Sequence, residues 1–217
     1  MIEVEVKFEL LAQAQLKEYF PTMQFVRHVH NSDVYYDTPG FDLLRQAVFV
    51  RVRNQQRLEF KFNAQADPAH VQSTERAFSL RPSPSEAEEM HALFTRFLPQ
   101  WRTADSVEEA LCCNGLVELA RIENSRICYS REDIIICVDQ VEGIGDFVEI
   151  EMQCEEDGDT RQAIARLCDL TAGFAARQVC VGYVELWLQR HHPHAYRLGK
   201  YHEEHSLHPV NRSPTGC

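Results

Sequence analysis

The chain has 217 residues, of which 44% are hydrophobic and 25% are charged, and its formal net charge is −11. This length allows one large domain with a substantial core, or at most two small ones. The negative charge argues against general nucleic-acid binding, and no run of about 18 apolar residues is present to span a membrane. Because the sequence begins with charged residues, Glu3 and Glu5, we expect no signal peptide and a cytoplasmic location.

A period of two dominates the hydrophobic pattern, which is typical of β-strands. Strands are predicted at residues 1–8, 28–37, 47–54, 57–63, 72–79, 117–129, 133–140 and 147–154. Helices are predicted at residues 10–20, 83–98, 107–116, 159–174 and 183–191. These eight strands suit antiparallel pairing, and neither an internal repeat nor a domain boundary is evident. We therefore expect an α+β fold with one domain over residues 1–192.

Residues 193–217 differ from the rest of the chain in composition. They are polar, lack apolar periodicity and carry most of a group of six histidines between His191 and His208. We interpret this segment as a solvated, flexible C-terminal tail. Metal binding by its histidines is the alternative that the composition leaves open.

The eight cysteines lack the spacing of a disulfide framework or of a zinc site. No CxxC pair is present, and Cys112 and Cys113 are adjacent. Cys128 and Cys137 lie in apolar strand-like runs, where a free cysteine behaves as a small hydrophobic residue. We therefore expect free thiols in a reducing compartment.

Charged residues share one face of strand after strand. In the first strand Glu3, Glu5 and Lys7 alternate with apolar residues, and in the third Arg51 and Arg53 alternate with valines. A solvated sheet face would explain part of this pattern, but such faces are usually rich in Thr, Ser, Lys and Gln. Eight strands are enough to close a barrel around a small ligand. We therefore predict a closed eight-stranded antiparallel β-barrel, or tunnel, with a charged interior and helices packed outside.

The charges of this predicted interior indicate the ligand. Parity places on the charged face Glu3, Glu5, Lys7, Asp37, Arg51, Arg53, Glu59, Lys61, Glu75, Arg126, Asp139, Glu149 and Glu151. Buried carboxylates without partners are costly, and clustered carboxylates suit a hard divalent cation, above all Mg²⁺ or Mn²⁺. The bases in the same cavity suit phosphate oxygens, which arginine binds bidentately. Together they indicate a complex of a metal ion with a triphosphate.

The same residues carry a resemblance to a known family. Glu3-Val4-Glu5-Val6-Lys7 resembles the ExExK signature of the CYTH superfamily, the triphosphate tunnel metalloenzymes. Further matches follow in order: Tyr35-Tyr36-Asp37-Thr38-Pro39, Arg51-Val52-Arg53, Leu58-Glu59-Phe60-Lys61, Glu75, Arg126, Asp139 and Gly145-Asp146-Phe147-Val148-Glu149-Ile150-Glu151. The superfamily includes thiamine triphosphatases, inorganic triphosphatases and class IV adenylate cyclases.

Two details bear on the subgroup. Leu188-Gln189-Arg190, followed by Pro193 and Tyr196, is more similar to animal-type thiamine triphosphatases than to the cyclases. Phe49 occupies the place where that subgroup carries an aromatic that stacks on thiamine, although a plug for one tunnel end is an equal alternative. In one departure, Val181-Gly182 precedes Tyr183 where the family usually has a basic residue and Ser. This departure concerns the segment that would cover the tunnel.

Residue chemistry and the resemblance together imply roles for the charged residues. The predicted metal ligands are Glu3, Glu5, Asp139, Glu149 and Glu151, with Glu59 and Glu75 as candidates for a second metal or for ordering water. The predicted triphosphate-binding residues are Lys7, Arg51, Arg53, Lys61 and Arg126, with Phe49 for the organic group. Water activation is assigned to Lys61 with Tyr35 or Tyr36, only one of which can face inward.

The resulting functional prediction is a metal-dependent hydrolase that removes the terminal phosphate of thiamine triphosphate or inorganic triphosphate. It is expected to act as a monomer on a small molecule, without nucleic-acid or membrane partners. A class IV-type adenylate cyclase that releases pyrophosphate from ATP is one alternative. A non-catalytic module that binds polyphosphate or a nucleotide is another, since fold alone does not decide function.

Overall fold

The computed structural model describes residues 2–10, 23–63, 73–154, 166–167, 169, 176–179 and 181–199. The strands are β1 (Ile2–Leu10), β2 (Gln24–Asp37), β3 (Phe49–Arg53), β4 (Arg57–Asn63), β5 (Ser73–Ser79), β6 (Val117–Arg131), β7 (Ile134–Val141), β8 (Gly145–Cys154) and β9 (Ala176–Val179). The helices are η2 (Leu44–Gln46), α2 (Pro84–Phe97), α3 (Val107–Cys113), α5 (Tyr183–His191) and α6 (Pro193–Leu198). Leu10, the first residue of the helix predicted at 10–20, belongs to β1. The rest of that helix and most of the one predicted at 159–174 lie outside the described residues.

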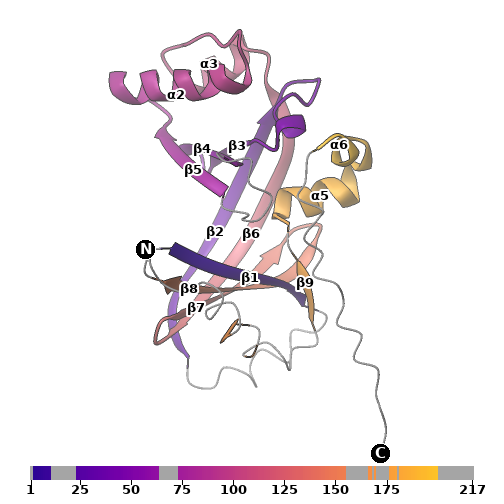
Figure 1. Ribbon diagram of the computed structural model, residues 1–217. Coiled ribbons are helices and arrows are strands. Elements are labelled where there is room, and N and C mark those ends of the chain that lie inside the picture. Colours follow the sequence, from indigo (N-terminus) through magenta and orange to yellow (C-terminus); the bar gives the residue numbers. More distant parts are fainter. Residues whose placement is uncertain are drawn as a thin grey trace, which may run out of the picture.

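The strands form one curled antiparallel sheet in the order β5-β4-β3-β2-β6-β7-β8-β1-β9. The long strands β2 and β6 pair at its centre and join the β3-β4-β5 part to the β7-β8-β1 part (Figure 1). The predicted α+β class and tunnel-like antiparallel sheet are confirmed. Two details differ over the described residues: the sheet has nine strands, and no hydrogen-bonded ladder joins β5 to β9.

The apolar face of the sheet lies outside, as strand parity predicts. Val50 and Phe60 are buried in a cluster with the helix residue Phe94, and α2 and α3 lie together at the β3-β4-β5 end of the sheet (Figure 1). At the other end, Val148 and Ile150 are buried in a second cluster on the same face. Burial of one such side chain stabilises the fold by about 1.5–3 kcal/mol. These clusters therefore determine that the apolar residues lie on the outer face and the charged residues on the inner face.

Helix α2 has clear sequence signals at its start. The Ser83 hydroxyl accepts a hydrogen bond from the Glu86 N–H, and the Glu86 carboxylate accepts one from the Ser83 N–H at 2.8 Å. This capping box satisfies free N–H groups, and Pro84 at the first helical position needs none. Met90 and Phe94, four residues apart, then face the sheet and are buried. The spacing of these buried residues therefore packs α2 against the apolar, convex face of the sheet.

Helices α5 and α6 pack on the opposite, concave face. Leu186 and Leu188 of α5 are buried in a cluster with Ile122 and Phe147, which share a strand face with the charged residues Arg126 and Glu149. Ala195 of α6 is buried in the same cluster, so part of the segment predicted as a tail forms a packed helix. Residues 200–217 lie outside the described residues. None of the described helices has the length and apolar character needed to cross a membrane.

The cysteines differ from expectation at one place. Cys128 and Cys137 are directly opposite each other in the β6–β7 ladder and form a disulfide. The prediction of free thiols is wrong for this pair, because a separation of nine residues that looked unrelated in sequence becomes a cross-strand pair in the hairpin. Cys112 and Cys113 are free, as predicted, and both are exposed.

Candidate functional site

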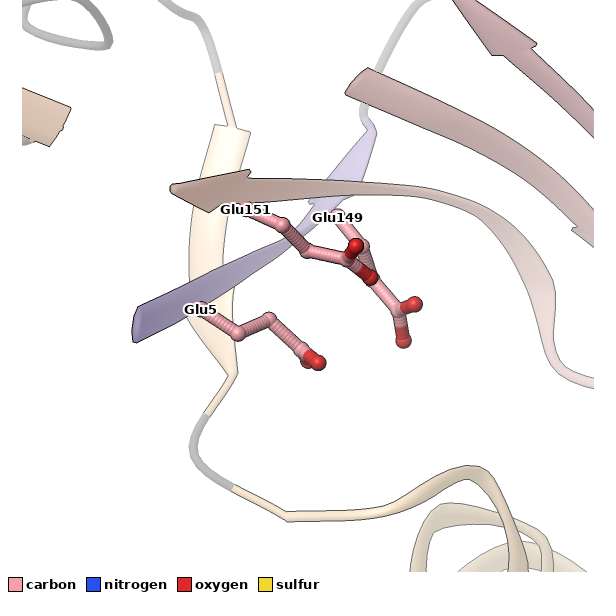
Figure 2. Close-up of side chains that lie close together, drawn as sticks. All are labelled: Glu5, Glu149 and Glu151. Atoms are coloured by element: carbon pink, nitrogen blue, oxygen red, sulfur yellow. The ribbon is translucent and has the colours of Figure 1, made fainter. Parts of the chain in front are cut away.

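Three carboxylates from two neighbouring strands converge on the concave face. Glu5 of β1 lies directly opposite Glu151 of β8, and Glu149 lies opposite Lys7 in the same ladder. One carboxylate oxygen from each glutamate lies within 4.8 Å of the other two, and Figure 2 shows the three side chains extending from β1 and β8 to the same side. Oxygen donors that carry negative charge fit a hard divalent cation such as Mg²⁺ or Mn²⁺. The Glu3 side chain lies outside the described residues.

The three carboxylates do not share one electrostatic environment. Burial, followed by the Glu149 charge, raises the pKa of Glu5 above its usual value. Burial acts in the same direction on Glu149, but the charges of Lys7 and Arg126 hold the pKa of Glu149 below its usual value. The Lys7 ammonium lies 3.0 Å from Glu149 and 3.5 Å from Glu5. Of these two carboxylates, Glu149 therefore ionises more readily and Glu5 takes up a proton more readily.

Asp139 on β7 is fully buried, and protein groups occupy its oxygens. Arg126 of β6 donates to both oxygens, at 2.7 and 2.6 Å, and also contacts Glu149. Asn124 and Tyr183 donate to the same carboxylate at 3.0 and 2.6 Å. Asp139 thus orients Arg126 beside the three glutamates, and its predicted role as a metal ligand stays a prediction. We call Glu5, Lys7, Arg126, Asp139, Glu149 and Glu151 the acidic wall.

A second charged network covers the concave face of β2, β3 and β4. Arg51 donates to Glu59 at 2.8 Å and to Asp33 at 3.1 Å, while Arg53 binds Asp33 through two nitrogens at 2.8 and 2.7 Å. Arg57 pairs with Glu59 at 2.5 Å. Among the described residues, three guanidinium groups share two carboxylates, so this network, which we call the arginine wall, has an excess of positive charge. In it, Glu59 is engaged by arginines and is separate from the three-glutamate cluster.

Asp33 was not predicted from the sequence as a residue of the charged face. It shares a strand face with Tyr35, lies opposite Arg53 in the β2–β3 ladder and is buried. Its position two residues before Tyr35 was the available signal, because alternate residues of a strand share a face. The expected inward residue Asp37, by contrast, does not serve the site. Its carboxylate accepts hydrogen bonds from the N–H groups of the following turn, Leu43 and Leu44 among them, at 2.7–3.0 Å.

Of the two candidate tyrosines, only Tyr35 reaches the charged face. Its hydroxyl accepts a hydrogen bond from Arg51 at 3.0 Å, and burial raises its pKa. Tyr36 instead packs against the apolar cluster of the convex face. Phe49 packs against the concave apolar cluster that contains Leu186 of α5. Phe49 therefore lies where the helices meet the charged face.

Lys61 and Glu75 lie on the outer strands of the arginine-wall side. They form an ion pair at 3.4 Å, and both side chains are more than half exposed. Lys61 nevertheless lies within electrostatic reach of the acidic wall, since its charge acts to lower the pKa of Glu5 and of the α5 residue Glu185. The structure thus brings Lys61 toward the opposite wall but leaves Glu75 outside the three-glutamate cluster.

The comparisons with known proteins agree with this fold. A model of the CYTH domain matches residues 1–172 of the chain. The PH1819 protein from Pyrococcus horikoshii shares 22% identity, with a TM-score of 0.60 over 87% of this chain and 99% of that one. HpAC1 from Hippeastrum, described as a candidate adenylyl cyclase with a dominant triphosphatase activity, shares 17% identity, with a TM-score of 0.57 over 87% of this chain and 96% of its own.

A further solved structure, described as a candidate adenylate cyclase from Vibrio parahaemolyticus, shares 16% identity, with a TM-score of 0.54 over 86% of this chain and 98% of that one. At these identities the likeness shows a common fold and leaves the reaction open. No curated protein sequence matches this chain.

Proposed function

This chain belongs to the CYTH domain family, and we propose that it is a metal-dependent hydrolase that removes the terminal phosphate of thiamine triphosphate or inorganic triphosphate. The observation that carries the proposal is the division of one concave face into two parts. Three clustered glutamates lie on one wall, and an excess of guanidinium groups lies on the other. A small polyanion that arrives with a divalent cation matches both parts at once.

The acidic wall supplies the metal site of this proposal. Glu5, Glu149 and Glu151 would hold the ion, and Glu3 is proposed to join them. A bound divalent ion neutralises phosphate oxygens and so supports phosphoryl transfer, which depends on positioning and electrostatics more than on covalent help. Lys7 is held at 3.0 Å from Glu149 and sits beside this cluster, where it can bind a phosphate oxygen.

The cationic side chains would hold the triphosphate along the face. Arg126 is fixed by two hydrogen bonds to Asp139, and Arg51 and Arg53 are fixed by Asp33. Side chains that are fixed before the substrate arrives lose little rotational freedom on binding. Arginine forks also match the geometry of phosphate oxygens. We therefore assign these three arginines to the substrate.

The attacking water requires a group that orients it and accepts its proton. A lysine accepts a proton only in its neutral form, which nearby cations favour. We assign this role to Lys61 together with Tyr35, because Tyr35 reaches the charged face and Tyr36 does not. The Tyr35 hydroxyl is anchored by Arg51, which couples substrate binding to the position of the tyrosine. The roles of Glu59 and Glu75 in a second metal site and of Phe49 in binding thiamine remain part of the proposal.

The test is a side-by-side assay of thiamine triphosphate, inorganic triphosphate and ATP with Mg²⁺, Mn²⁺ or EDTA. The proposal predicts phosphate release from one of the first two substrates, which depends on the metal and stops with EDTA. Cyclic AMP from ATP would identify a cyclase instead, the activity for which the Hippeastrum and Vibrio proteins are named candidates. Binding of the triphosphates without turnover would identify a binding module. We further propose that the protein acts as a cytoplasmic monomer.

A further inference from the structure

Tyr183, the first residue of α5, contacts the acidic wall from outside the sheet. Its hydroxyl donates a hydrogen bond to Asp139 at 2.6 Å. Its ring lies 4.6 Å from the Lys7 ammonium, in cation–π geometry. The same ring lies 5.0 Å from the ring of Phe147 on β8. One side chain therefore touches β1, β7 and β8, the three strands that carry the carboxylates of the wall.

The groups that Tyr183 touches control two of the proposed phosphate-binding cations. Asp139 is fully buried and holds the Arg126 guanidinium through both carboxylate oxygens. A buried carboxylate that loses one donor becomes free to reorient or to take up a proton. Burial, followed by the charges of Glu149 and Asp139, raises the pKa of Tyr183, which keeps its hydroxyl protonated as a donor.

The position of Tyr183 is itself fixed by the packing of α5. Leu186 and Leu188 are buried in the concave apolar cluster, and Arg190 near the end of the helix donates to Glu9 of β1 at 2.6 Å. The helix is therefore attached to the strand that carries Lys7 at one end and contacts Asp139 at the other. Attachment at both ends of the helix can hold the Tyr183 side chain within the small positional tolerance that a binding site requires.

We propose that Tyr183 is a positioning residue, which sets the Arg126 guanidinium through Asp139 and the Lys7 ammonium through its ring in the arrangement that binds a triphosphate. The inference rests on the proposed triphosphate site, though not on turnover. It assigns to α5 a part in substrate binding.

The first test measures the affinity for a methylene-bridged triphosphate analogue, which cannot be hydrolysed, by calorimetry with Mg²⁺ present. Tyr183→Phe removes the hydroxyl and keeps the ring, and we expect an affinity loss of about 10- to 100-fold, the range for a hydrogen bond to a charged group. Tyr183→Leu also removes the contact with Lys7 and should bind more weakly still. Tyr129→Phe, on β6 but on the opposite strand face from Arg126, is the matched control and should bind like the unmodified protein.

A double-mutant cycle separates positioning from a general structural role. If Tyr183 acts through Asp139, Tyr183→Phe in an Asp139→Asn background should cost less than about twofold in affinity. The inference would be overturned if the affinity losses of Tyr183→Phe and Asp139→Asn added up in the double variant. It would also be overturned if Tyr183→Phe alone bound the analogue as tightly as the unmodified protein. The unmodified protein could bind the analogue but hydrolyse no triphosphate. If Tyr183→Phe then still lowers the affinity, the inference stands and the hydrolase proposal is refuted. Absence of analogue binding in the unmodified protein would refute both.

Discussion

The two walls of the concave face are both built from ion pairs, yet they differ in what they leave unbalanced. In the arginine wall, three arginines close around Asp33 and Glu59, so the surplus charge is positive. Among the described residues that form the acidic wall, Lys7 and Arg126 lie beside four carboxylates, so the sum of their formal charges is negative. A buried or half-buried surplus requires a partner of opposite charge. The difference therefore predicts which wall binds a cation and which binds an anion.

The pairing within each wall also keeps the surplus groups in place. Arg51 is shared by Asp33 and Glu59, and Glu149 is shared by Lys7 and Arg126. A group that is held by two partners cannot swing away when its ligand is absent. The following changes are designed to break one wall at a time, in order of expected effect.

The largest effect is expected from Glu149→Gln, which removes a charge from the three-glutamate cluster. Metal-dependent turnover should fall by at least about 100-fold, because an uncharged amide is a poor ligand for a hard cation. The fold should persist, since Arg126 keeps Asp139 and Lys7 keeps Glu5 as partners. The measurement is turnover across a Mg²⁺ titration, with the exposed Glu118→Gln as control. Unchanged turnover in the variant would remove Glu149 from the metal site.

A smaller effect on a different parameter is expected from Arg51→Lys in the arginine wall. The charge is kept but the fork that binds two oxygens is lost, so KM for the triphosphate should rise about 10-fold. The affinity for Mn²⁺ alone should not change, because Arg51 lies outside the three-glutamate cluster. Steady-state kinetics and metal titration together test this, with the exposed Arg121→Lys as control. An equal loss of metal affinity would mean that the walls do not act separately.

The walls should also differ in their response to pH. Burial, followed by the Glu149 charge, raises the pKa of Glu5, so protons compete with the cation as the pH falls through that raised value. Mn²⁺ affinity should then weaken by up to about tenfold per pH unit, and Glu5→Gln should flatten the slope. Without metal, the folded state holds this proton more tightly than the unfolded state. The contribution of Glu5 to stability should therefore be fully present below the ordinary pKa of glutamate and be lost as the pH rises through the raised pKa.

The smallest effect is expected where α5 is attached to β1. Burial raises the pKa of Glu9, but hydrogen bonds from Arg177 and Arg190 outweigh this effect and hold the pKa below its usual value. Glu9→Gln should lower the free energy of unfolding by about 1 kcal/mol at neutral pH. This contribution is present above the unfolded-state pKa of glutamate and is lost as the pH falls through the depressed value. Urea denaturation at neutral pH and near pH 3 tests it, and a difference that stays constant between the two would contradict the assignment.

The sequence predicted the strand faces because alternation is a local property. Once Glu5, Lys7 and Glu149 were read as members of strands, their common face followed from the period of two. What stayed hidden depended on contacts between distant segments. Tyr183 contacts Asp139, which lies 44 positions earlier in the sequence, and the sequence pattern around neither residue predicts that contact.

Local patterns also misled where one residue type has two uses. Asp37 follows the strand parity of a site residue, but its carboxylate binds the backbone of the next turn, as aspartate often does. Cys128 and Cys137 looked like small apolar residues, and only the strand register makes them opposite neighbours. The family resemblance supplied the order of the motifs. The geometry supplied the division of the site into two walls.

The account depends on a cation bound by the acidic wall, and anomalous diffraction from crystals grown with Mn²⁺ and the methylene-bridged triphosphate analogue tests it directly. We predict a manganese peak within about 2.5 Å of the carboxylates of Glu5, Glu149 and Glu151, with the phosphates extending from it toward Arg51 and Arg53. A peak held by the arginine-wall carboxylates instead, or no peak at the three glutamates, would contradict the assignment of the two walls.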